Sequence, residues 1–296
     1  MAALILFGLK ASILLTVFSI GLSTIPRDVA YVVCRPSLLI RSLLSLNVVM
    51  PLFAALMLAI VHLQPAVEIG LIALSVSPVP PLLPKKTRKT AGDASYAIGL
   101  VVVAAFLAIV FVPLSVHWLG MAFDTRSEIS PTTIALIMAT NVLAPMGIGL
   151  LCHHFARPFA EQIAKPLAKF ASILLIVSVL PILVTKTPEI LSLTGSGTLA
   201  AVTAFVLVGL VAGHLLGGPD PANRAVLALT TSSRHPGVAA AIAAVNFPLQ
   251  TLVGSTILLY LVVNMIASVA YVRWFRHYYP ETAGADSRRE TRGLDR

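Results

Sequence analysis

Charged residues are scarce in this sequence. Only 11% of its 296 residues are Asp, Glu, Lys or Arg and 57% are hydrophobic, whereas about 25% of the residues of a soluble domain are charged. Cysteine is almost absent as well, and Cys34 and Cys152 form no CxxC pattern. The composition therefore excludes an ordinary soluble domain, and the cysteines give no reason to expect a disulfide or a thiolate metal site.

Long hydrophobic runs take the place of charge. Apolar blocks of about 20 residues, the length that a helix needs to cross a bilayer, alternate with short polar or basic stretches. We predict an all-α polytopic membrane protein with nine spans, of which the third and eighth are interrupted, over roughly 3–24, 38–61, 66–91, 94–117, 130–153, 165–185, 198–217, 222–246 and 249–273. The first run lacks the cleavage site of a signal peptide and is predicted to be the first membrane helix. A single transmembrane domain over 1–278 and a disordered cytoplasmic tail over 279–296 complete this prediction.

The net charge of +9 is unevenly distributed along the chain. With the C-terminus inside, nearly all of the 21 Lys and Arg residues lie on the cytoplasmic side, and the outer loops keep only Arg126 and Lys186. This bias predicts an N-out, C-in chain in the cytoplasmic (inner) membrane. It also explains the basic composition without nucleic acid as a partner. One basic cluster either sets this topology or contacts substrate: Lys85, Lys86, Arg88 and Lys89.

The two interrupted segments resemble each other. A shift of 156 residues superposes them without a gap and places Pro65 on Pro221, Ser77 on Ser233 and Pro80 on Pro236. An odd number of spans separates their starts, so the two copies run in opposite directions across the membrane. Paired broken helices in an inverted-topology repeat mark the binding site of many transporters. We therefore expect two halves, over about 1–125 and about 126–278, whose broken helices cross.

Acidic residues are missing from the predicted membrane interior, because all 12 lie in loops, in the tail or at helix ends. The run 222–246 is broken instead by Arg234, His235 and Pro236. A proline there leaves unpaired N–H groups at the start of the second half-helix, an end that favours anions and lies beside two basic side chains. We predict an anion-selective substrate site lined by Thr230, Thr231, Ser232, Ser233, Arg234, His235, Gly237, Ser77, Pro80, Pro81, Asn47 and Asn264.

The polar side chains of this site also have structural interpretations. Arg234 either binds the anion or pairs with backbone carbonyls that the break at Pro236 frees. His235 either binds substrate or a proton, or is a satisfied structural histidine. Asn47 and Asn264 either contact substrate or join helices by hydrogen bonds.

Enzyme chemistry finds no support in the sequence. His153 and His154 have no Cys, Asp or Glu partner at ligand spacing, and Ser233 near His235 is not a nucleophile–base arrangement. We expect no catalytic residue, no metal ligand and no cofactor.

Further motifs are typical of one family of transporters. They comprise Phe18-Ser19-Ile20-Gly21-Leu22-Ser23 with Pro26-Arg27-Asp28, Arg35-Pro36 with Met50-Pro51, the ungapped stretch 78–93 that ends in Ala91-Gly92-Asp93, the segment from Gly237-Val238-Ala239 to Phe247-Pro248, and Asn264. On these motifs nearly the whole chain resembles the bile acid:sodium symporter family. The resemblance implies a panel domain and a core domain, two broken helices that cross in the core, and transport by alternating access.

The chain departs from that family at the positions that hold sodium. The resemblance places the family's Ser-Asn on Leu83-Pro84, its Glu on Thr230, its Gln-Asn on Arg234-His235, an assisting Ser and Thr on Ala97 and Val101, and a further Gln on Leu46. A hard cation needs several oxygen ligands, and a neighbouring guanidinium repels it. The resemblance therefore supports transport more strongly than it supports sodium coupling.

Three functions stay open on this reading. The leading one is a secondary transporter of small organic anions, in which coupling is absent or runs through protonation of His235. The second is a sodium-coupled symporter that uses Thr230 to Ser233 and freed carbonyls as neutral ligands. The third is a membrane sensor or interaction protein that keeps the scaffold without transport. The expected partners are an organic anion and the lipid bilayer.

Overall fold

The computed structural model describes residues 2–80, 93–122, 132, 136, 139–195, 197–247 and 249–280. Every regular element in these ranges is a helix, which confirms the prediction of an all-α chain. In chain order they are α1 (Ala2–Ser23), α2 (Pro26–Val33), α3 (Pro36–Leu44), the π-helix η1 (Ser45–Val49), α4 (Met50–Ile60), α5 (Pro65–Val76), α7 (Ala94–Ala122), the π-helix η3 (Ala139–Leu143), α9 (Ala144–Phe155), α10 (Arg157–Leu193), α11 (Thr198–Leu216), α12 (Pro221–Ser232), α13 (Pro236–Asn246) and α14 (Val253–Tyr278). The basic cluster 85–89 and the predicted tail beyond residue 280 lie outside the described residues.

The chain is a multi-pass membrane protein. Within the described residues, five helical stretches are long and apolar enough to cross a bilayer, and they are Pro36–Ile60, Ala94–Ser115, Arg157–Leu193, Thr198–Leu216 and Val253–Tyr278. A sixth is formed by α1 and α2 if this pair, bent by 89°, counts as one span.

The remaining predicted spans are the interrupted or partly described ones. The third corresponds to α5, whose 12 residues are too few to cross a bilayer, and the rest of it falls outside the described residues. The eighth is divided into α12 and α13, of 12 and 11 residues. The fifth is represented by η3 and α9, and its start is largely outside the described residues. Nine spans therefore remain a prediction.

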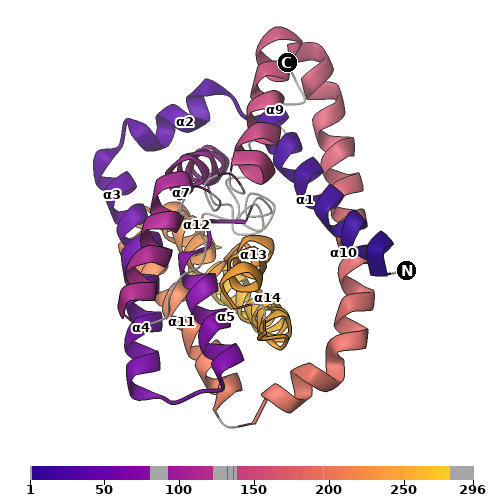
Figure 1. Cartoon of the computed structure of the whole chain (residues 1–296). Helices are drawn as coiled ribbons and strands as arrows, with labels where there is room; N and C mark the ends of the chain where they lie inside the picture. The colour runs from indigo at the N-terminus through magenta and orange to yellow at the C-terminus, as the bar shows by residue number, and fades with distance from the viewer. Residues whose placement is uncertain are drawn as a thin grey trace.

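The helices pack in two groups (Figure 1). In one group α1, α9 and α10 pack together, and part of their contact is a small apolar cluster around Leu22, Ala160 and Ala164. In the other, α4, α5 and α11 to α14 surround a larger core that includes Leu71, Leu227 and Tyr260. α5, α12 and α13, the described helices of the two interrupted segments, lie in this second group.

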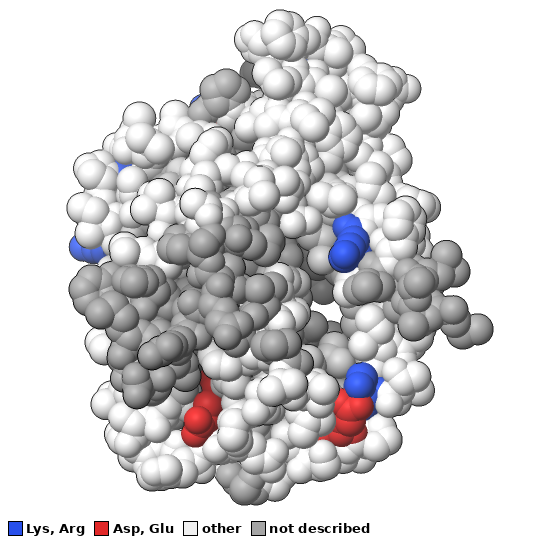
Figure 2. Space-filling view, viewed as in Figure 1, with Lys and Arg blue, Asp and Glu red and all other residues white. Residues whose placement is uncertain are grey.

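Apolar side chains cover much of the outer surface. Val184 and Leu215 are 70% and 73% exposed, on two of the helices that are long enough to span a membrane. On the face drawn in Figure 2, charged side chains of the described residues are few, and most of the described surface is uncharged. Such a surface is suited to contact with lipid.

Two glycines of α11 determine how closely α12 approaches it. A Cβ added at Gly209 would lie 2.8 Å from the Cα of Ser232, and one at Gly213 would meet the carbonyl oxygen of Leu227. Small residues allow membrane helices to approach backbone to backbone. α11 thus supports α12 up to its last residue, Ser232, immediately before the break.

Candidate functional site

The predicted break in the eighth segment lies between α12 and α13. Residues 233–235 are non-helical, and Pro236 is the first residue of α13, where its missing N–H costs nothing. His235 caps this helix, because its Nδ1 accepts a hydrogen bond from the Val238 N–H at 3.3 Å. The imidazole therefore has a structural role, as one of the two interpretations expected, although the sequence did not predict that this role is a helix cap.

α5 repeats the design of α12. Each helix has 12 residues, begins at a proline and ends before a serine in extended conformation, Ser77 or Ser233. The two breaks contact each other, because the His235 N–H donates to the Pro78 carbonyl at 2.9 Å. The two helix ends that the 156-residue shift superposes are therefore neighbours in space.

Arg234 is buried at the junction, with 2% of its surface exposed. Its Nη1 donates to the Ser77 carbonyl at 3.2 Å, and its Nη2 donates to the Leu46 carbonyl at 2.9 Å. The guanidinium thus pairs with backbone carbonyls, as one of the two interpretations expected. However, these carbonyls belong to the end of α5 and to η1 rather than to the helix that Pro236 breaks.

The backbone at the break is tied to α14. The Arg234 N–H donates to the Tyr260 hydroxyl at 2.6 Å, and the same hydroxyl donates to the Ser232 carbonyl at 2.7 Å. One phenol therefore pairs both a donor and an acceptor that the end of α12 would otherwise leave unsatisfied.

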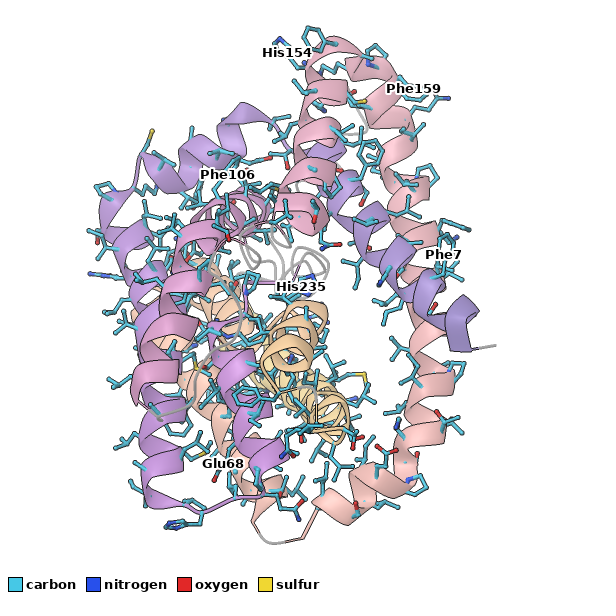
Figure 3. The ribbon with its side chains drawn as sticks, in the orientation of Figure 1. Phe7, Glu68, Phe106, His154, Phe159 and His235 are labelled. Carbon is cyan, nitrogen blue, oxygen red and sulfur yellow. The ribbon has the colours of Figure 1, made fainter. Side chains whose placement is uncertain are left out.

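Two buried polar atoms at the break have no hydrogen-bond partner within the described part of the chain. They are the Nε of Arg234 and the Nε2 of His235, whose residue is 4% exposed. Buried polar groups are nearly always paired, so an unpaired one calls for an explanation such as an absent ligand. Figure 3 shows His235 at the start of α13, on the side that faces α1. α1 is close there, since a Cβ at Gly237 would lie 3.3 Å from Cδ1 of Ile13.

The predicted hydroxyl and amide groups form a buried polar layer around this junction. Across helices, Thr231 shares a hydrogen bond with Ser45 at 2.8 Å, and Asn264 donates to Ser233 at 3.4 Å. The hydroxyls of the remaining three bond carbonyls of their own helices, Thr230 to Val226, Ser232 to Leu229 and Ser77 to Leu74. The structure therefore brings α12, η1 and α14 together through these side chains.

The other predicted site residues are placed as follows. Asn47 is half-buried on η1, next to Leu46, and Pro80 is half-buried after the end of α5. Gly237 lies in the first turn of α13. Pro81 lies outside the described residues.

No carboxylate neutralises Arg234 in the described part of the chain. The ion pairs found there are Arg157–Glu161 and Lys186–Glu189. The same residues contain no group of three His, Cys, Asp or Glu side chains that could hold a metal ion. The junction is thus a buried positive charge held by neutral groups.

Tyr260, Ser45 and the Leu46 carbonyl also belong to this junction, and none of these three contacts was predicted from the sequence. Tyr260 lies in a long apolar run, where a tyrosine gives no signal of its own. For the Leu46 carbonyl the sequence does contain a signal, which is Pro51. In a π-helix this carbonyl would accept from the N–H five residues later, and Pro51 has no N–H to donate.

Comparison with protein families matches residues 11–193 to the sodium bile acid symporter family. The matched range is more than half of the chain and extends from α1 to the end of α10. It ends before α12, so Arg234 and His235 lie outside it. Comparison with curated proteins gives no match.

Proposed function

The chain belongs to the sodium bile acid symporter family, and from this premise we propose that it is a secondary transporter that moves a small organic anion across the cytoplasmic membrane. Members of the family are transporters rather than enzymes. The proposed mechanism is alternating access, in which the group α1, α9 and α10 moves against the group that contains the two broken segments.

The observation that carries the choice of an anion is the buried charge of Arg234. Its Nε and the neighbouring Nε2 of His235 are buried without partners in the described residues. The guanidinium is always charged, and its remaining N–H groups suit carboxylate or sulfonate oxygens. Immediately after it, the N-terminal end of α13 adds a partial positive charge, which also favours an anion.

The proposed substrate site extends from this charge over both breaks. Arg234 and His235 would contact the anionic group, and the polar layer would orient the rest of the molecule. The proposed lining is Thr230, Thr231, Ser232, Ser233, Arg234, His235, Gly237, Ser77, Pro80, Pro81, Asn47 and Asn264.

The proposed orientation is N-out and C-in, with two inverted halves over about 1–125 and about 126–278. Transport would then be uncoupled, as uniport or exchange, or coupled to protons through His235. A sodium-coupled mechanism is less favoured, because a guanidinium at the junction repels a second cation within a few ångströms.

The test is uptake of labelled organic anions by the purified protein in proteoliposomes. We expect Arg234→Gln to lower the initial rate at least about tenfold, since a hydrogen bond to a charged group contributes about 1.5–3 kcal/mol. Arg234→Lys retains the charge and should retain part of the rate. The matched control is Arg157→Gln, because Arg157 is an exposed arginine on α10. Unchanged uptake by Arg234→Gln at normal protein level would overturn the proposed anion site.

A further inference from the structure

The oxygen atoms that hold Arg234 are of the kind that a bound cation uses. In transporters with broken helices, freed carbonyls and the C-terminal ends of half-helices coordinate Na⁺ or H⁺. Here the Ser77 carbonyl stands directly after the end of α5, and it accepts from Nη1 of Arg234. Ser232 ends α12 two residues before Arg234, and its carbonyl accepts from the Tyr260 hydroxyl. The C-terminal end of α5, which carries partial negative charge, therefore holds the guanidinium.

The second oxygen that holds the guanidinium, the Leu46 carbonyl, is made available by a proline. Leu46 lies in η1, where each carbonyl would accept from the N–H five residues later. For Leu46 that residue is Pro51, which has no N–H. The Leu46 carbonyl accepts instead from Nη2 of Arg234 at 2.9 Å. The carbonyl that η1 leaves without a backbone donor is thus paired by the side chain of Arg234.

The positive charge at this junction is carried by the protein itself, on the guanidinium of Arg234. Arg234 is 2% exposed and has no carboxylate partner in the described residues. Sodium would need these carbonyl oxygens for itself, and the guanidinium already fills them. The residues present therefore do not fit a sodium ion beside Arg234.

We propose that the Arg234 guanidinium is a tethered cation that replaces a coupling ion at the junction of the two broken segments. It holds α5, η1 and the end of α12 together permanently, so the protein needs no Na⁺ to form its substrate site. This inference deepens the proposed transport function and rests on it for its biological meaning, but it concerns the ion requirement alone.

The test is thermal unfolding of the purified protein in NaCl and in choline chloride at equal ionic strength. The wild type should have the same Tm in both salts. Arg234→Gln in choline should unfold at least about 5 °C lower, and Na⁺ or guanidinium at roughly 10–100 mM should restore part of the loss with saturation. Arg234→Lys should be more stable than Arg234→Gln and indifferent to Na⁺. Arg157→Gln, the surface control, should behave as the wild type.

Either of two results would overturn the proposal: a wild type that Na⁺ stabilises with saturation, or an Arg234→Gln protein whose Tm equals that of the wild type. If Arg234→Gln yields no folded protein, the wild type and Arg234→Lys decide. Saturable stabilisation of either protein by Na⁺ would then overturn the proposal. These measurements use no transport. A protein that carries no organic anion, yet keeps its indifference to Na⁺, would contradict the proposed function and leave the tethered cation standing.

Discussion

Nη2 of Arg234 donates a hydrogen bond to the carbonyl oxygen of Leu46 at 2.9 Å, although 188 residues separate the two in the chain. The contact joins η1 to the break between α12 and α13, and it forms only once these helices are packed. Because the donor is a buried charge, this contact both holds the helices of the junction together and fixes the position of its positive charge.

Replacing Tyr260 by Phe should destabilise the protein by about 1–3 kcal/mol, because the buried Arg234 N–H and Ser232 carbonyl would lose their shared partner. Thermal unfolding of the purified variant measures the effect. Tyr278→Phe is the matched control, since Tyr278 lies on the same helix and is 64% exposed. Equal Tm values for the two variants would contradict the bridging role of the Tyr260 hydroxyl.

His235 combines a capping role with the proposed binding role, and two substitutions separate them. Asn is among the best helix caps, so His235→Asn should keep the start of α13 while removing the imidazole. We expect near-normal Tm and reduced anion uptake for His235→Asn, and a loss of both for His235→Ala, which removes the cap at a cost of about 1 kcal/mol. Full uptake by a stable His235→Asn protein would show that the ring does not contact substrate.

Adding a methyl group at Gly209 should push α12 away from α11. The new Cβ would lie 2.8 Å from the Cα of Ser232, and overpacking of this kind costs about 1–3 kcal/mol. Gly147→Ala is the control, because nothing lies within 4 Å of its added Cβ. That variant should be as stable as the wild type or slightly more stable, and a Gly209→Ala protein that matches it would contradict the close approach of the two helices.

Ser255 links α14 to α10 by a hydrogen bond between the two helix groups. Its buried hydroxyl donates to Glu189 at 2.6 Å, and Glu189 also pairs with Lys186. We expect Glu189→Ala and Ser255→Ala to be non-additive in Tm, because each substitution removes the hydrogen bond between the Ser255 hydroxyl and the Glu189 carboxylate. The exposed pair Arg157–Glu161 provides the comparison cycle, whose coupling should be smaller. Additive effects at Ser255 and Glu189 would show that the two groups do not interact in solution.

The breaks could be predicted because prolines and serines mark them locally. Pro65 and Pro221 begin the 12-residue helices α5 and α12, and Pro236 begins α13. Proline is preferred at the first position of a helix, so each of these starts could be expected from the sequence. The aggregate basic bias and the apolar runs likewise indicated a polytopic all-α chain.

What the sequence could not reveal depends on tertiary packing. No local pattern specifies that the Tyr260 hydroxyl accepts from the Arg234 N–H, or that the Leu46 carbonyl accepts from the Arg234 side chain. His235 is a further case, because histidine is not a usual cap and its ring accepts from Val238 only in this arrangement. Arg234 could be recognised from the sequence, whereas the carbonyl oxygens that hold it depend on contacts that form only in the folded chain.

Sodium dependence of uptake tests the central claim most directly. Wild-type proteoliposomes are loaded identically and diluted into NaCl or into choline chloride, and the initial rate of organic-anion uptake is measured in each. With Arg234 in the place of a coupling cation, the two rates should be equal within error. If an inward Na⁺ gradient raises the uptake rate several-fold, and the rate falls when the gradient is collapsed, the claim that Arg234 replaces the coupling ion is contradicted.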